Sequence, residues 1–297
     1  MTSTHASRTT GPSLGTMARM EMIRLAKNPF FIIGNLIAFG FLVFFFVRGE
    51  SSDLAVQDLL SWPVVPAFFI GLPALVVMAR QTGSTEAAAE AMSASPGSEA
   101  RRTSALVLAC LLPAALGALW IATEVIGNAF KDVAAEEFWF GTMNDAELWA
   151  MLIGAGPVAC LGGALLGVLV GRWLHFPGAA AVVVVGLVAS DMLAQIALAD
   201  DNPVLRLWTP WIMWHSGTQD DLTSTVFGGN PVFSLVYLLC LCAAAALAAI
   251  HHDQSARTPR LKQAFAAVVV VGLAALALSM TTGETENRDS EPSSKIG

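Results

Sequence analysis

Residues 29–47 read PFFIIGNLIAFGFLVFFFV, a run in which Asn35 is the only polar side chain. At the 1.5 Å rise of an α-helix, a run of this length crosses the ~30 Å hydrocarbon core of a bilayer. Comparable apolar runs follow at 62–79, 104–122, 149–170, 177–199, 231–250 and 264–280. A backbone inside lipid must satisfy its own hydrogen bonds, so we expect all seven runs to be helices. The sequence therefore predicts an all-α polytopic membrane helix bundle.

The composition supports this class and excludes others. The 297 residues are 55% hydrophobic and only 13% charged, against about 25% charged in an average soluble domain. The net charge of −7 argues against binding to nucleic acid. All four cysteines (Cys110, Cys160, Cys240 and Cys242) lie in apolar runs without a Cys-x-x-Cys spacing. We therefore interpret them as small buried hydrophobes rather than as a zinc site or a disulfide framework.

The basic residues predict the orientation in the membrane. If the N-terminus is cytoplasmic, eleven of the sixteen basic residues fall on the inner side: Arg8, Arg19, Arg24, Lys27, Arg80, Arg101, Arg102, Arg172, Arg257, Arg260 and Lys262. The positive-inside rule favours this orientation. Seven spans then place the C-terminus outside the cell, provided that 264–280 is a true span. The alternative for this last run is a tilted or interfacial hairpin partner.

Both termini differ in composition from the rest of the chain. Residues 1–14 are polar, and residues 281–297 are rich in Thr, Glu, Ser, Asp and Pro. Such segments have too little apolar surface to fold by burial, so we expect both to be disordered.

Signatures of soluble enzymes are absent from the sequence. It contains no Gly-x-x-x-x-Gly-Lys-Ser/Thr phosphate loop, no His-Glu-x-x-His helix and no Gly-x-Ser-x-Gly elbow. The histidine pair His251 and His252 lies at the end of a span beside Asp253, where we expect interfacial solvation. If the protein moves a substrate with ATP, another chain must hydrolyse the ATP.

Asp191 is the only carboxylate that we predict inside a span. A carboxylate within the membrane is costly unless it is paired or faces water, so it is a functional candidate. Gln195 lies one turn later on the same helix face. One interpretation makes Asp191, Gln195 and Asn35 a polar lining of a translocation path. The alternative is a hydrogen bond between helices, from Asp191 to Asn35 or Thr123, and a proton relay is a third possibility.

A tryptophan cluster follows the fifth run. Trp208, Trp211 and Trp214 lie in the segment LWTPWIMW, residues 207–214, and tryptophan favours the headgroup layer. We expect a short helix that lies on or dips into the outer leaflet, with a simple aromatic belt as the alternative.

Three further patterns concern helix packing and the cytoplasmic side. Gly163, Gly167 and Gly171 repeat every four residues, which allows another helix to approach closely. Residues 17–29 form a basic amphipathic stretch that should lie along the inner leaflet and turn at Asn28 and Pro29. Residues 81–103 should form the longest ordered cytoplasmic segment between spans, with a short helix over 85–92.

Together these segments resemble the permease subunit of a type-2 ABC exporter, of the kind that exports drugs or antibiotics in actinobacteria. The resemblance covers residues 15–255. The stretch from Arg19 to Lys27 is similar to the family's elbow helix, and the tryptophan segment falls where the family has outer re-entrant helices. The coupling segment of the family is matched by Glu86, Glu90, Ser95, Pro96, Arg101 and Arg102. The chain departs from the pattern by an additional span within 256–280 and by the tail 281–297.

The resemblance implies a division of labour between chains. A partner ATPase subunit would bind ATP and Mg and contact the coupling segment, whereas this chain would hold no cofactor. A second permease chain, identical or related, would complete the path through the cytoplasmic membrane. The walls of Phe, Leu and Val suggest an amphiphilic or apolar substrate. Two alternatives stay open from the residues alone: an ion- or proton-coupled carrier that depends on Asp191, and a membrane-embedded enzyme or scaffold.

Overall fold

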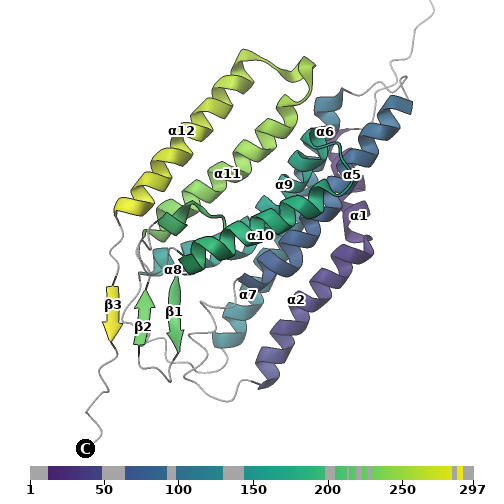
Figure 1. Cartoon of the computed structure of the whole chain (residues 1–297). Coiled ribbons are helices and arrows are strands. Elements are labelled where there is room, and N and C mark those ends of the chain that lie inside the picture. Colours follow the sequence, from purple (N-terminus) through teal and green to yellow (C-terminus); the bar gives the residue numbers. More distant parts are fainter. Residues whose placement is uncertain are drawn as a thin grey trace, which may run out of the picture.

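The computed structural model describes residues 13–48, 64–91, 98–129, 144–197, 205–212, 214–218, 223–226, 229–282 and 286–289 (Figure 1). These residues form an all-α bundle with a small three-stranded sheet at one end. The opposite end carries the starts of the helices Glu99–Ala109 and Pro259–Thr281, which include Arg101 and Arg260, and we call it the basic end. The end with the strands is called the sheet end.

Six helices of the described chain are long and apolar enough to cross a membrane. They cover Pro29–Val47, Val64–Ser84, Glu99–Gly127, Asp145–Trp173, Pro231–His251 and Pro259–Thr281. Each overlaps one of the runs predicted from the sequence, which confirms a multi-pass membrane protein. The fifth predicted run corresponds to α10 (Ala179–Ala197), whose described apolar stretch, Ala179–Ala194, is shorter than the other six.

The spans are built from the following helical elements. They are α2 (Pro29–Arg48), α4 (Val64–Pro66), η1 (Ala67–Gly71), α5 (Leu72–Ala91), α6 (Glu99–Ala109), α7 (Leu111–Ala129), α8 (Asp145–Ile153), η2 (Gly154–Val158), α9 (Ala159–Trp173), α11 (Pro231–His251) and α12 (Pro259–Thr281). The elements η1 and η2 are single π-helical turns inside longer helices. Pro157 lies within η2 and Pro66 precedes η1, and proline interrupts the regular i→i−4 hydrogen bonds. Both wide turns contact α7 in the core.

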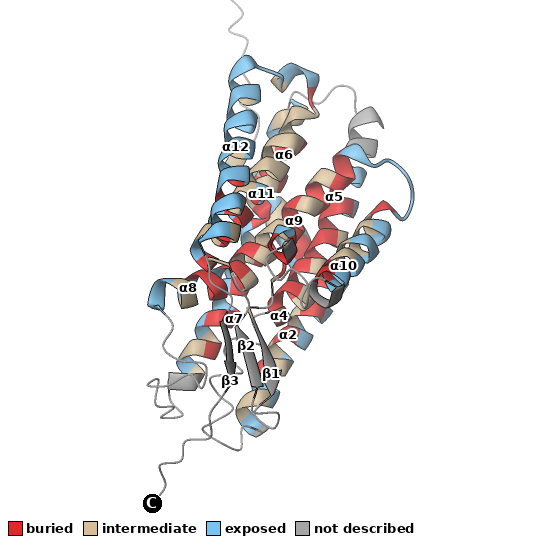
Figure 2. Ribbon diagram, turned by 60° about the vertical axis from the view of Figure 1, so that its left-hand side comes forward, coloured by how far each residue is buried: buried red, intermediate tan, exposed pale blue. Residues whose placement is uncertain are grey.

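The centre of the bundle is the contact between α5 and α9 (Figure 2). A Cβ atom added to Gly163 would lie 2.6 Å from the Gly71 carbonyl oxygen, and one added to Gly171 would lie 2.6 Å from the Ala79 carbonyl oxygen. The same atom at Gly167 would overlap the carbonyl oxygen of Leu75. The predicted glycine face is therefore confirmed, and its partner is a helix of the same chain.

The local sequence determines where the N-terminal helix begins and how the chain turns into the next helix. Ser13 accepts a hydrogen bond from the Thr16 amide at the start of α1 (Leu14–Ala26). After α1, the Asn28 side chain accepts from the Phe30 amide (3.0 Å), and Pro29 opens α2. The predicted amphipathic helix with its turn at Asn28 and Pro29 is thus confirmed. It packs against α6 through its buried Leu25 side.

The last two helices form an antiparallel hairpin at the edge of the bundle. Asn230 caps α11 by accepting from the Val232 and Phe233 amides, and its own amide donates to the Ser279 carbonyl near the end of α12 (2.9 Å). The outer face of α12 exposes large apolar side chains, such as Val270 and Leu273. The run predicted at 264–280 is therefore both long enough to span and the hairpin partner of α11.

Neither the sheet nor its third strand, which lies in the C-terminal tail, was predicted from the sequence. Strands β1 (His215–Thr218), β2 (Thr223–Val226) and β3 (Glu286–Asp289) form an antiparallel sheet in the order β1-β2-β3. Strand β3 belongs to the tail 281–297, for which we expected disorder, and it pairs Thr223 with Asp289. Its polar composition carries no hydrophobic period, so backbone pairing with β2 forms an element that periodicity could not predict.

Candidate functional site

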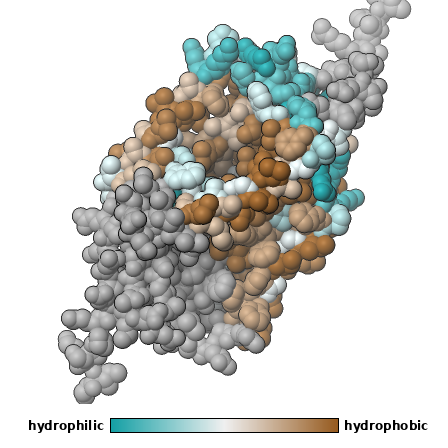
Figure 3. All heavy atoms as spheres, viewed as in Figure 1, coloured by the Kyte–Doolittle hydropathy of each residue, from teal (hydrophilic) through white to brown (hydrophobic). Residues whose placement is uncertain are grey.

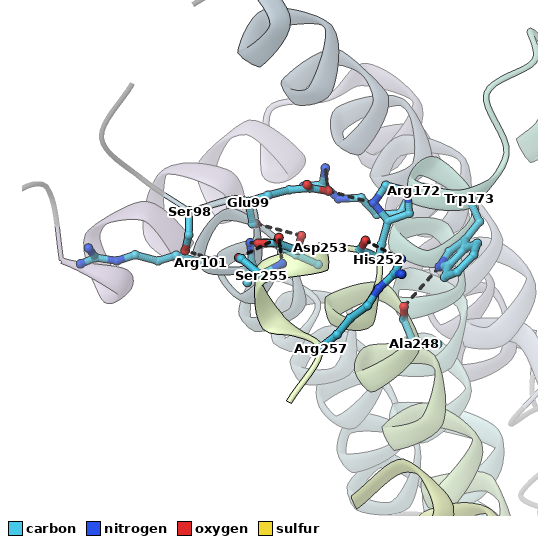
Figure 4. A network of polar contacts seen from close by, with 12 residues as sticks. Ser98, Glu99, Arg101, Arg172, Trp173, Ala248, His252, Asp253, Ser255 and Arg257 are labelled. Atoms are coloured by element: carbon cyan, nitrogen blue, oxygen red, sulfur yellow. Dashed lines mark hydrogen bonds and ion pairs between the residues drawn. The ribbon is translucent and has the colours of Figure 1, made fainter. Parts of the chain in front are cut away.

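A polar cluster joins three helices at the basic end (Figure 4). Glu99, the first residue of α6, accepts a hydrogen bond at Oε1 from Nη1 of Arg172 in α9 (3.4 Å). The same Oε1 lies 2.9 Å from Nδ1 of His252, directly after α11. The Arg172 side chain is only 2% exposed, whereas Glu99 is 39% exposed. Glu99 therefore lies at the surface and holds a buried arginine and a histidine from two other helices.

Asp253 caps the start of α6 from the other side of the cluster. Its Oδ2 accepts from the Ala100 amide (2.7 Å), and its Oδ1 accepts from the amide and hydroxyl of Ser255 (both 2.8 Å). Burial by itself raises the pKa of the Asp253 carboxyl. The hydrogen bonds from Ser255 and Ala100, together with the charge of Arg172, outweigh burial and hold the pKa below its ordinary value. Asp253 is therefore ionised wherever the fold is intact at neutral pH.

Trp173 and Arg257 complete the cluster around the end of α11. The Trp173 indole donates to the Ala248 carbonyl (3.2 Å) and meets the His252 ring edge-on at 5.3 Å between centroids. Arg257 donates to the carbonyls of His251 (3.1 Å), the last residue of α11, and of His252 (3.3 Å), the residue that follows it. We call Glu99, Arg172, Trp173, His252, Asp253 and Arg257 the basic-end clamp. The sequence interpretation of His252 as merely solvated is wrong, because it bonds to Glu99.

The predicted coupling segment is partly visible beside this clamp. Glu86 and Glu90 lie in the last turns of α5, whose helix runs without a break from the span to Ala91. The separate short helix expected over 85–92 is therefore wrong, since it is an extension of the span. Arg101 is exposed and Arg102 is half-buried in the first turns of α6. Ser95 and Pro96 lie outside the described residues.

The two predicted path residues whose side chains are described, Asp191 and Asn35, make hydrogen bonds to different partners. Asp191 in α10 is 7% exposed and bonds to the Thr209 side chain and the Trp211 backbone, which follow η3 (Leu205–Trp208). Its Oδ1 has no hydrogen-bond partner among the described residues. Asn35 donates instead to the Phe31 carbonyl of its own helix (2.7 Å).

The two predicted partners of Asp191 are therefore wrong, and its hydrogen bonds join α10 to the segment at Thr209 and Trp211 instead. Thr123, the other candidate partner, donates to the Leu119 carbonyl of its own helix (2.8 Å). The backbone of Gln195 lies in α10, and its side chain is outside what the structure describes.

The tryptophan segment differs from the predicted helix. A single 3₁₀ turn ends at Trp208, and the chain then turns through Thr209 and Pro210. Trp208 is 47% exposed, but Trp211 is 7% exposed and stacks on Phe68 with 5.2 Å between ring centroids. Trp214 is half-buried. Of the three, Trp208 therefore has the strongly exposed ring expected at a lipid interface, whereas Trp211 belongs to the core.

A large apolar groove opens beside these tryptophans. Its volume is about 500 Å³, and its floor is formed by α9 at Gly162 and Leu166. Its sides are formed by α10, α11 and α12, and Trp208 also lines it. Figure 3 shows hydrophobic side chains over this face of the molecule. Pockets of this size and character accommodate drug-sized apolar molecules.

Glu124 is a buried carboxylate that the sequence prediction missed. We placed the end of the third span at 122, but α7 continues to Ala129 and includes Glu124, which is 4% exposed. A second acidic side chain therefore lies inside a span. The signal was present in the sequence, because Val125 and Ile126 continue the apolar run beyond residue 122.

Two further searches gave no positive finding. Within the described ranges, no group of three or more His, Cys, Asp or Glu could hold a metal ion. Comparison with protein-family models, curated proteins and solved structures finds no match for this chain.

Proposed function

We propose that this chain is the membrane-spanning permease subunit of an ATP-driven ABC exporter in the cytoplasmic membrane, with its basic end facing the cytoplasm. The observation that carries the proposal is the basic-end clamp. It fastens the start of α6, which belongs to the predicted coupling segment, to the ends of α9 and α11 through Glu99 and Asp253.

The clamp gives a partner ATPase a physical means of moving the spans. A shift of the segment between α5 and α6 moves Glu99 and the Ala100 amide, and hence Arg172 and Asp253, which are bonded to them. The extension of α5 that carries Glu86 and Glu90 is continuous with the helix packed on α9. ATP binding can drive transport only if the partner's closure favours one arrangement of these helices over another.

The groove supports an amphiphilic or apolar substrate. It is lined by Leu, Ala, Gly and aromatic side chains and lies between apolar helices. An apolar solute gains about 25 cal/mol for each Å² of apolar surface that it buries there instead of in water. The OH of Tyr237, which donates to the Trp208 carbonyl (3.0 Å), supplies a polar contact near the sheet end of the groove.

Co-purification tests the proposal. The full chain, tagged and extracted from its native membrane in mild detergent, should bring with it a stoichiometric ATPase subunit and ATP turnover. The charge reversals Glu86→Lys and Glu90→Lys should remove the ATPase from the complex. Asp145→Lys, a charge reversal at the start of α8 near the sheet end, is the matched control and should retain it. Absence of any ATPase from wild-type complexes would overturn the proposal.

A second candidate function is an ion- or proton-coupled carrier. It is favoured by the two buried carboxylates in apolar helices, Asp191 and Glu124. Buried carboxylates of this kind often mark ion or proton pathways. For such a carrier, Asp191→Asn should abolish transport in proteoliposomes, and collapse of the proton gradient should do the same in the wild type. Transport by an ABC exporter should survive collapse of the gradient.

A further inference from the structure

A second cavity lies at the basic end, separate from the groove and next to the clamp, since its lining residue His175 lies 6.2 Å from His252 between ring centroids. Its volume is about 510 Å³, and it opens between the end of α5 and the turn from α9 to α10. Arg80 and Gly83 line it from α5, and the turn residues from His175 to Gly178 line it from the opposite side. Gly178 has a positive φ of 90°, a conformation that glycine adopts without strain. The wall of the cavity therefore depends on a glycine turn.

The cavity is divided into an apolar base and a basic rim. The buried side chains of Ala79, Val170 and Ala179 pack together at its base. At the rim, Arg80 and His175 are both exposed. A ligand that fills the whole cavity must therefore combine an apolar part with an anionic part.

Arg80 is a cation without a protein partner in the described part of the chain. No hydrogen bond or ion pair of Arg80 is present there. Arg172, which lies at the same end, is by contrast bonded to Glu99. Arg80 falls within the apolar helix Val64–Ser84, four residues from its end. An arginine at this position keeps its guanidinium at the level of the lipid headgroups while its stem packs against apolar surface.

We propose that this cavity binds an anionic phospholipid, with the phosphate on Arg80 and the glycerol and upper acyl chain over the apolar base. A planar guanidinium donates two parallel hydrogen bonds to a phosphate, which a compact ammonium group cannot match. His175 lies at the same rim. Because the ligand contacts both α5 and the turn between α9 and α10, it holds these two elements together at the membrane surface. This lipid is a resident ligand and not the exported substrate, so the inference stands apart from the proposed function.

The test compares lipids on the purified full chain in detergent. Phosphatidylglycerol, phosphatidylcholine and inorganic phosphate are titrated separately, and bound lipid is counted by native mass spectrometry alongside thermal unfolding. Wild-type protein should retain phosphatidylglycerol in preference to phosphatidylcholine and gain thermal stability from it. Inorganic phosphate should have no effect. Arg80→Gln should weaken the retention of phosphatidylglycerol at least about tenfold, since a charge-assisted hydrogen-bond pair is lost.

Two matched controls separate the cavity from general surface charge. Arg260→Gln removes an exposed cation at the same end outside the cavity and should retain the lipid. Ala181→Trp fills the cavity without a change of charge and should lose the lipid, whereas Val185→Trp, one turn further along α10 and outside the cavity, should keep it. The Arg80 and Arg260 pair decides the question even if the tryptophan variants fail to fold.

Several results would overturn the proposal. Equal retention of both lipids, or equal losses in Arg80→Gln and Arg260→Gln, would mean that the cavity does not select an anionic headgroup. Stabilisation by inorganic phosphate alone would assign a simple anion site. If Ala181→Trp changed the oligomeric state and left lipid retention intact, a second protein chain rather than a lipid would cover the cavity.

Discussion

Gly167 determines how closely α5 and α9 can pack, and replacing it with alanine tests the core of the bundle. The added Cβ would overlap the carbonyl oxygen of Leu75 and lie 2.9 Å from the Leu75 Cα. These are backbone atoms, so no side chain can rotate away to make room. The substitution can be accommodated only if the two helices move apart along the face that also contains Gly163 and Gly171.

The expected magnitude follows from two opposing effects. Alanine is favoured over glycine inside a helix by about 1 kcal/mol. Forcing an extra methyl group into a close-packed core costs about 1–3 kcal/mol, and the upper part of this range applies where backbone must move. We therefore expect Gly167→Ala to lower the free energy of unfolding by about 1–2 kcal/mol.

Gly186→Ala provides the matched control. Gly186 lies in α10, is exposed, and has nothing within 4 Å of the position that a Cβ would occupy. There the same substitution changes helix propensity alone and should leave stability unchanged or raise it by up to about 1 kcal/mol.

Unfolding of both variants and the wild type in the same detergent, followed by circular dichroism during denaturant titration, measures the order of stability. We expect Gly186→Ala to be at least as stable as the wild type, and Gly167→Ala to be less stable. A Gly167→Ala protein as stable as the wild type would refute the close α5–α9 contact. Equal destabilisation of both variants would instead show that loss of any glycine is harmful.

Two further predictions concern the clamp and the groove. The pKa of Asp253 is lowered in the folded protein, so its contribution to stability is present above the ordinary aspartate pKa of about 3.9 and is lost as the pH falls through the lower folded value. The stability difference between wild type and Asp253→Asn should therefore shrink as unfolding is measured from pH 6 down to about pH 3; a difference independent of pH would contradict the ionised cap. In the groove, Ala245→Trp adds a large side chain to the wall and should weaken the binding of a fluorescent amphiphile about tenfold in a titration of purified protein. Val270→Trp, on the lipid-facing side of α12, should leave that binding unchanged, and equal losses in both variants would mean that the probe binds elsewhere.

The spans could be predicted from the sequence because the bilayer allows few solutions. A run such as 29–47 has no route to a stable state in lipid other than a helix, whatever its neighbours are. The glycine face of α9 was predictable for a related reason, since three glycines four residues apart have a common side in any regular helix. What the pattern could not give was the partner, which is α5 of the same chain.

The clamp could not be predicted, because its members are distant in sequence. Glu99 meets Arg172 across 73 residues and His252 across 153 residues. Each residue alone fits an interfacial, solvated position, and only the packing of α6, α9 and α11 brings them together. The prediction of a helix over the tryptophan segment failed for a local reason. Pro210 prevents a helix from continuing past Thr209, and Trp211 therefore turns inward onto Phe68.

The path of α10 follows from contacts made by its neighbours. The Trp173 indole at the end of α9 donates to Ala248 near the end of α11, so both helices end at the basic end. The start of α11 is bonded through Asn230 to Ser279 near the end of α12, which places that start at the sheet end. Between α9 and α11 the chain must therefore return from the basic end to the sheet end, and α10 is the described helix on this route (Figure 1). The bundle is thus traversed seven times, although the described apolar stretch of α10 is shorter than those of the other six helices. An odd number of traverses puts α1 and the last turn of α12 at opposite ends. The traverse with the shortest described apolar stretch, which contains Asp191, also forms a side of the groove.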